Sequence, residues 1–242
     1  MEESAESKYT IYYWPISFRG EFIKILLTSQ GIAYSTAKVG ELLALKNAPI
    51  GSTAGLNFMA PPLLYDMEEK VYVSQTGTIV SYLARKHHLV PQDHYKLMIA
   101  EKLVNDCNDV LAELTRNNGS KMWEEVDDFK AFLDGRFKKW LQIIEKTGTD
   151  NGLKDGQYYL GGEQMTFADT SLVACFGVMD HCLGGVERKF GQVLRLHAPI
   201  VMQLVDRLKQ DENIKAYFGQ MKETPYCGGQ IEASIRKMCD AL

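Results

Sequence analysis

Three short segments in the first third of the chain carry side chains suited to binding a small ligand. Tyr13–Pro15 (YWP) ends an aromatic, β-branched run that predicts a strand, so the Tyr13 hydroxyl can point into a cleft. Ala60–Leu64 (APPLL) places prolines before another predicted strand, where a cis bond leaves the preceding backbone able to pair with an extended peptide. Ser74–Thr76 (SQT) opens a predicted helix, whose free N–H groups suit a carboxylate. Together the segments indicate a site for a small, acidic, peptide-like ligand; separately, they can be a core tyrosine, turn prolines and a helix cap.

Other polar motifs lack the spacing that their chemistry requires. His87 and His88 are adjacent rather than four residues apart, and they lack the glutamate of a zinc helix. Gly51–Gly55 (GSTAG) lacks the Gly-Lys-Ser/Thr ending of a phosphate loop. We therefore expect neither a metal site nor a nucleotide site.

The elements that must position the three segments alternate between strand and helix. Hydrophobic periodicity and turn residues predict the order β-α-(α)-β-β-α before a linker at 90–93. The predicted strands are Tyr9–Tyr13, Pro62–Tyr65 and Lys70–Val73, and the predicted helices are Phe18–Ser29, Gly40–Asn47 and Thr76–His88.

After about residue 95 the pattern is almost wholly helical. Leu97–Leu114, Phe129–Ile144 and Pro199–Leu208 each repeat apolar residues at helical spacing. Thr166 and Asp169 form a capping-box pattern that opens the most apolar helix of the chain, which we expect in the middle of a bundle. The fold class is therefore α/β plus all-α: a small α/β domain at residues 8–90, followed by an all-helical domain at residues 96–242.

Composition and charge restrict the class of protein further. The 242 residues are 45% hydrophobic and 24% charged, typical of a globular chain with a core. The net charge is −4, and no block of Lys and Arg offers a footprint for nucleic acid. The N-terminus predicts neither a secretory signal nor a transit peptide, and the longest apolar stretch is too short for a bilayer. Five scattered cysteines without a C-x-x-C pattern indicate reduced thiols, so we expect a cytoplasmic protein that binds neither nucleic acid nor membrane.

At this point the chain resembles the cytosolic glutathione S-transferases. The matching pieces occur in the family's order and near its spacings: residues 9–27 (YTIYYWPISFRGEFIKILL), 60–66 (APPLLYD), 73–84 (VSQTGTIVSYLA), 103–111 (LVNDCNDVL) and 166–172 (TFADTSL). The resemblance implies a thioredoxin-like N-terminal domain that binds glutathione, an all-helical C-terminal domain, and a homodimer.

The resemblance also suggests which hydroxyl activates the glutathione thiol. Tyr13 lies where the mu, pi, alpha and sigma classes place the tyrosine that hydrogen-bonds the sulfur, while Ser17 is the rival, as in the zeta, theta and tau classes. A hydroxyl donor favours the thiolate, which is the nucleophile. Lowering the thiol pKa by two units requires about 3 kcal/mol, within reach of a charge-assisted hydrogen bond and a helix dipole.

Further residues are implied to bind the rest of the tripeptide. Gln75 and Thr76 match the family's Gln-Ser pair, which binds the γ-glutamyl end. Asp106 resembles the acidic residue that reaches the γ-glutamyl amine of glutathione bound in the other subunit, with a solvated helix acid as the alternative. Lys46 is a candidate for the glycyl carboxylate, and so is Arg19.

The chain departs from the family at its prolines. Pro62 matches the family's cis-proline, and the preceding residue normally pairs its N–H and C=O with the cysteinyl backbone of glutathione. Here that residue is Pro61, which has no N–H. Either one backbone bond is lost, or the cis bond is Ala60–Pro61 and the register is shifted.

The implied activity is attack of the glutathione thiol on a small hydrophobic electrophile, with glutathione as cosubstrate and without metal or other cofactor. The second substrate is expected near residues 111–123 and near Tyr217, Phe218 and Tyr226, although these aromatic residues can equally belong to the core. The alternatives are a glutathione-dependent isomerase of the prostaglandin or maleylacetoacetate type, and a non-catalytic structural or regulatory relative.

Overall fold

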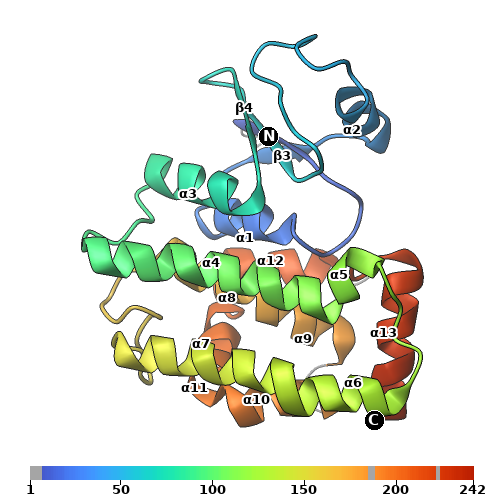
Figure 1. Ribbon diagram of the computed structural model, residues 1–242. Coiled ribbons are helices and arrows are strands. Elements are labelled where there is room, and N and C mark those ends of the chain that lie inside the picture. The colour runs from blue at the N-terminus through green and yellow to red at the C-terminus, as the bar shows by residue number, and fades with distance from the viewer. Residues whose placement is uncertain (1–6, 185–188, 222–223) are drawn as a thin grey trace.

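A mixed sheet of four strands forms the N-terminal part of the protein (Figure 1). The computed structural model describes residues 7–184, 189–221 and 224–242. The strands lie in the order β2-β1-β3-β4, in which β1 and β2 are parallel and the other pairs are antiparallel. Their bounds are β1 (Tyr9–Tyr12), β2 (Tyr34–Thr36), β3 (Leu63–Asp66) and β4 (Val71–Ser74).

Three helices accompany the sheet, and two local predictions need correction. The helices are α1 (Glu21–Ser29), α2 (Val39–Lys46) and α3 (Thr76–Lys86). Strand β2 was not predicted, because its three residues are polar or half-exposed and are held by pairing with β1. Helix α1 begins at Glu21 rather than Phe18, because the backbone of Ser17 pairs with Tyr226 from the far end of the chain.

The rest of the chain is helical, as predicted. The elements are α4 (His94–Leu114), α5 (Arg116–Gly119), α6 (Val126–Phe132), η1 (Leu133–Phe137), α7 (Lys138–Asp150), α8 (Phe167–Leu172), η2 (Val173–Gly177), α9 (Val178–Leu183), α10 (Lys189–His197), α11 (Pro199–Leu208), α12 (Glu212–Gln220) and α13 (Gly229–Ala241). The predicted helix at Phe129–Ile144 lies within a continuous run from α6 to α7, in which η1 is a π-helical turn. The domain division at residues 90–96 stays an interpretation.

The run from α8 to α9 lies in the middle of the helices, as the sequence predicted. Every residue of α8 and η2 is buried, and this run packs against α1, α4 and α11. The predicted capping box is confirmed: the Asp169 carboxylate accepts a hydrogen bond from Thr166 N at 2.7 Å. It also accepts one from Tyr159 N at 2.8 Å, which ties the preceding loop to the helix. Burial raises the pKa of Asp169.

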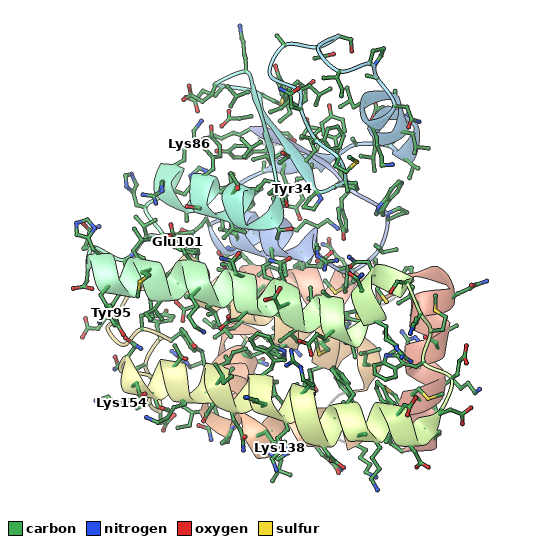
Figure 2. The ribbon with its side chains drawn as sticks, in the orientation of Figure 1. Tyr34, Lys86, Tyr95, Glu101, Lys138 and Lys154 are labelled. Atoms are coloured by element: carbon green, nitrogen blue, oxygen red, sulfur yellow. The ribbon has the colours of Figure 1, made fainter. Side chains whose placement is uncertain are left out.

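Helix α1 joins the sheet to the helices, because it packs against α3 on one side and against α8 and α12 on the other. Its first residue, Glu21, is buried and accepts hydrogen bonds from Lys24 at 3.0 Å and from the Tyr217 hydroxyl. Helices α3 and α4 are also linked: Figure 2 shows Glu101 on the side of α4 that faces α3, where it pairs with Arg85 at 3.2 Å. None of the helices described here combines the length and apolar character needed to cross a membrane.

Candidate active site

A cleft of about 1170 Å³ lies where the ends of β1 and β4 meet helix α4 and the C-terminal segment. Six of the predicted binding residues line it: Tyr13, Arg19, Lys46, Pro61, Gln75 and Thr76. These residues come from segments that are far apart in the sequence, and the four-stranded sheet brings the segments together. Asp106, which was also predicted, does not line the cleft of its own chain.

Tyr13 directly follows strand β1, and its side chain is only 4% exposed. Its ring packs on Gly20 at the N-cap of α1, so closely that a Cβ on Gly20 would lie 2.5 Å from Tyr13 Cδ1. Burial raises the pKa of the Tyr13 phenol well above its ordinary value. The Arg19 charge and hydrogen bonds from the backbone of Arg19 and Gly20 act in the opposite direction. The phenol therefore remains protonated at neutral pH and can serve as a hydrogen-bond donor.

Ser17, the alternative hydroxyl, is placed differently. It is fully buried and does not line the cleft, and its Oγ has no hydrogen-bond partner among the described residues. Its backbone is occupied by the C-terminal segment: Ser17 N donates to Pro225 O at 2.7 Å, and Cys227 N donates to Ser17 O at 3.3 Å. Of the two candidate hydroxyls, Tyr13 is the one on the cleft wall.

Gln75 and Thr76 lie at the junction of β4 and α3. Gln75 has φ 72° and ψ 123°, a backbone conformation that is uncommon outside glycine, and its side chain is exposed. Among the residues that the structure describes, no side chain caps the N-terminus of α3, which begins at Thr76 on the cleft wall. The first-turn N–H groups and the positive end of the helix dipole are therefore available for an anionic ligand.

The proline segment answers a question that the sequence left open. The bond between Pro61 and Pro62 is cis, so the alternative of a cis bond at Ala60–Pro61 with a shifted register is wrong. Pro61 lines the cleft two residues before strand β3. Because proline has no N–H, Pro61 can offer a bound peptide only its carbonyl oxygen.

Lys46 and Asp106 are both charged, but they face different surroundings. Lys46 is the last residue of α2 and is exposed at the rim of the cleft. Asp106, on α4, forms an ion pair with Lys102 one turn earlier.

Arg19, the other candidate for the glycyl carboxylate, lies beside Tyr13 on the cleft wall. Its guanidinium carbon lies 4.7 Å from the centre of the Phe18 ring. Its Nε donates to Asn108 Oδ1 at 3.3 Å, and its Nη1 donates to Asn118 Oδ1 at 2.8 Å. All three polar residues line the cleft. No short motif links Arg19 to the two asparagines, because they follow it by 89 and 99 positions.

The apolar wall of the cleft differs from the one expected. Tyr226 and Phe218 are buried in the core, and the Tyr217 hydroxyl is bonded to Glu21, so these aromatic residues do not line the cleft. The expected region at residues 111–123 contributes in part. The apolar side chains that line the cleft include Trp14, Ile16, Phe18, Ala112 and Ile231.

Comparison with known proteins identifies the family. Residues 99–238 match the family model described as "Glutathione S-transferase, C-terminal domain". The chain is 24% identical over 214 residues to "Glutathione S-transferase" of Dirofilaria immitis. The aligned region covers 86% of this chain and 91% of the relative. It is 23% identical over 216 residues to "Glutathione S-transferase P" of Homo sapiens, covering 86% and 90%.

A solved structure supports the same fold. The Pi-class glutathione S-transferase of Onchocerca volvulus superimposes with a TM-score of 0.72 at 19% identity, covering 92% of this chain and 98% of that structure. This likeness confirms a thioredoxin-like N-terminal part followed by a helical C-terminal part. Because the family model spans more than half of the sequence, the chain belongs to the cytosolic glutathione S-transferase family.

Proposed function

We propose that this protein is a glutathione transferase, which activates the thiol of glutathione for attack on small hydrophobic electrophiles in the cytoplasm. One observation carries the proposal: a single cleft gathers Tyr13, the open N-terminus of α3 and an apolar wall. These are a thiolate donor, an anion site and a surface for a hydrophobic second substrate.

The chemistry follows from the protonation state of Tyr13. A buried phenol whose pKa is raised keeps its proton and donates a hydrogen bond to the thiolate. Such a charge-assisted bond contributes ~1.5–3 kcal/mol, enough to lower the thiol pKa by about one to two units. The thiol proton leaves to solvent, and the thiolate forms a C–S bond with the electrophilic carbon. A leaving group then departs with its electron pair, or an added double bond takes a proton from water. No metal or redox cofactor is needed, because the nucleophile arrives with the cosubstrate.

The remaining cleft residues would hold the tripeptide in one orientation. Gln75 and Thr76 would bind the γ-glutamyl carboxylate at the N-terminus of α3, where the helix dipole favours an anion. Lys46 would bind the glycyl carboxylate at the opposite rim. The Pro61 carbonyl would accept a hydrogen bond from the cysteinyl N–H, while the second bond expected from this position is absent because proline cannot donate.

We further propose that two copies of the chain form a homodimer with shared sites. Asp106 would reach the γ-glutamyl amine of glutathione bound in the other subunit, since it does not line its own cleft. Exposed apolar side chains on α4 support a partner surface: Tyr95 is 60% and Met98 is 52% exposed. Figure 2 shows Tyr95 near the N-terminal end of α4.

Tyr13→Phe tests the proposal, because it removes the hydroxyl and retains the ring that packs on Gly20. We expect kcat/KM for conjugation of a chloronitroaromatic compound at neutral pH to fall ~10²-fold, from the loss of one charge-assisted donor. Retention on immobilised glutathione should be unchanged. The matched control is Ser17→Ala, which removes a buried hydroxyl outside the cleft and should leave kcat/KM near the wild-type value.

Three results would contradict the proposal in different ways. Full activity of Tyr13→Phe combined with inactive Ser17→Ala would assign the thiol to the serine. Turnover without consumption of free thiol would indicate a glutathione-dependent isomerase, which returns its cosubstrate. Failure of the wild-type protein to bind glutathione would indicate a non-catalytic relative.

A further inference from the structure

The hydrogen bonds of Arg19 differ from those of three other half-buried cations, each of which pairs with a carboxylate. Lys24 pairs with Glu21 at 3.0 Å, Lys86 pairs with Asp66 at 2.8 Å, and Arg195 pairs with Asp180 at 2.9 Å. In each case a carboxylate balances the charge. Arg19 is instead held by the amide oxygens of two asparagines. An amide accepts a hydrogen bond without carrying charge, so these contacts fix the guanidinium and leave its positive charge unbalanced.

Both asparagines are themselves fixed by the α4–α5 region. Asn108 Nδ2 donates to Val104 O at 2.9 Å, which turns its Oδ1 toward the guanidinium. Asn118 has φ 55° and ψ 37°, and its N–H donates to Thr115 Oγ1 at 3.2 Å. This left-handed conformation is costly for most residues and is tolerated best by glycine and asparagine.

The other titratable groups that face Arg19 do not neutralise it. They are Tyr13, Tyr226, Cys175 and Asp109. Burial raises the pKa of both phenols, so both are neutral at pH 7. Asp109 lines the cleft, but it forms no ion pair with Arg19 in the described part of the chain. Neither of the two asparagine bonds uses Nη2, which therefore keeps donors for a ligand.

We propose that Asn108 and Asn118 are positioning residues that hold the Arg19 guanidinium beside Tyr13 without neutralising it, so that its charge stabilises the thiolate of bound glutathione. This inference rests on the proposed function. It assigns a role to two asparagines that contribute no hydroxyl, thiol or charge of their own. It also predicts that a negative charge added at position 118 raises the thiol pKa more than loss of the amide does.

Asn118→Asp tests the inference, because it keeps the size and the acceptor oxygen and adds a carboxylate beside Nη1. In the binary complex with glutathione, the thiol pKa should rise by about 0.5–1 unit, which leaves roughly three- to tenfold less thiolate at neutral pH. The lower part of this range reflects the exposure of the Arg19–Asn118 bond to solvent. The thiolate is followed by its ultraviolet absorbance as a function of pH, and the pH profile of kcat/KM should shift by the same amount.

Asn117→Asp is the matched control, since it makes the same change at the adjacent exposed position, which is also left-handed (φ 57°) but does not line the cleft. Its thiol pKa should equal that of the wild type. Asn118→Gly keeps the turn conformation and removes the amide. It should also raise the thiol pKa, by less than Asn118→Asp, because the guanidinium is freed but not neutralised.

The outcomes separate this inference from the proposed function. If wild-type protein ionises glutathione and Asn118→Asp titrates like the wild type, the role of the asparagines is refuted while the transferase stands. An equal rise of the thiol pKa in Asn117→Asp would also refute the role of the asparagines. A carboxylate anywhere near the cleft would then raise the thiol pKa, whether or not it contacts Arg19. If thermal stability changes in the Asn118 variants but the thiol pKa does not, the asparagines are purely structural. If the wild type does not ionise glutathione, both proposals are wrong.

Discussion

Gly20→Ala examines whether close packing on helix α1 sets the position of the Tyr13 hydroxyl. Gly20 is the buried N-cap of α1, with φ −61° and ψ −24°, values that alanine adopts without strain. An added Cβ would lie 2.5 Å from Cδ1 and 2.8 Å from Cγ of Tyr13. The added methyl group must therefore act through collision with the ring rather than through the backbone.

The expected magnitude follows from this geometry. Because carbon atoms in contact are normally about 3.5 Å apart, the ring must move by about 1 Å. Overpacking a buried site in this way lowers the free energy of unfolding by ~1–3 kcal/mol. Displacing a catalytic group by about 1 Å can lower the rate ~10²-fold, equivalent to about 2.7 kcal/mol in the activation barrier. We expect both losses in Gly20→Ala, while glutathione binding changes little because Gln75 and Thr76 are not displaced.

The assays are urea unfolding and conjugation of a chloronitroaromatic compound at neutral pH. The control is Gly40→Ala in helix α2, where an added Cβ meets no atom within 4 Å. It should gain up to about 1 kcal/mol of stability from helix propensity and keep wild-type activity. In a Tyr13→Ala background, which lacks the ring, Gly20→Ala should cost no further stability.

The reasoning fails if Gly20→Ala keeps wild-type kcat/KM, since the ring position would then not matter for activity. It also fails if the loss of stability persists undiminished in the Tyr13→Ala background. That result would show that the methyl group collides with something other than the Tyr13 ring.

Two further predictions concern carboxylates outside the cleft wall. Burial alone would raise the pKa of Asp66, but hydrogen bonds from Lys86, Tyr82 and nearby backbone N–H groups outweigh it and lower the pKa. The folded carboxyl thus binds its proton more weakly than the unfolded one, so its stabilisation is complete above about pH 4 and is lost as the pH falls through the folded pKa. Urea unfolding between pH 7 and pH 3 should show this loss in the wild type and a flatter profile in Asp66→Asn. Asp106→Asn should weaken glutathione binding several-fold if the dimer shares its sites; calorimetry together with light scattering tests this, and unchanged affinity in a confirmed dimer would rule out the contact.

Local sequence patterns predicted most of the fold. Strands β1, β3 and β4 and the long helices have hydrophobic periodicities that are strong within each segment. The capping box at Thr166 and Asp169 was also predicted, because its two members are three residues apart and act on the same helix turn. The start of α1 was misplaced, because it depends on Pro225 and Tyr226, about two hundred positions further along the chain.

The residues of the candidate site also fall into two groups: those that local sequence patterns could select and those that depended on the fold. Tyr13, Gln75 and Thr76 could be selected from the sequence, because they stand at the ends of recognisable elements. Ser17 remained a rival until the fold buried it away from the cleft. Of the two placements that the sequence left open for Tyr217, Phe218 and Tyr226, the structure shows that these residues do not line the cleft. Hydrophobic periodicity does not distinguish a side chain that faces a cavity from one that faces the core.

The sequence by itself determined the family resemblance, the order of most of the elements and the two hydroxyls, of Tyr13 and Ser17, that could act on the thiol. These properties depend on residue types and short spacings, which the chain carries locally. Only the tertiary structure decided which wall of the cleft is apolar, which proline bond is cis, and that Arg19 is held by Asn108 and Asn118. Those contacts join residues 89 and 99 positions apart. They exist because the fold brings the turn before α1 close to α4 and α5, and no local pattern of residues encodes that approach.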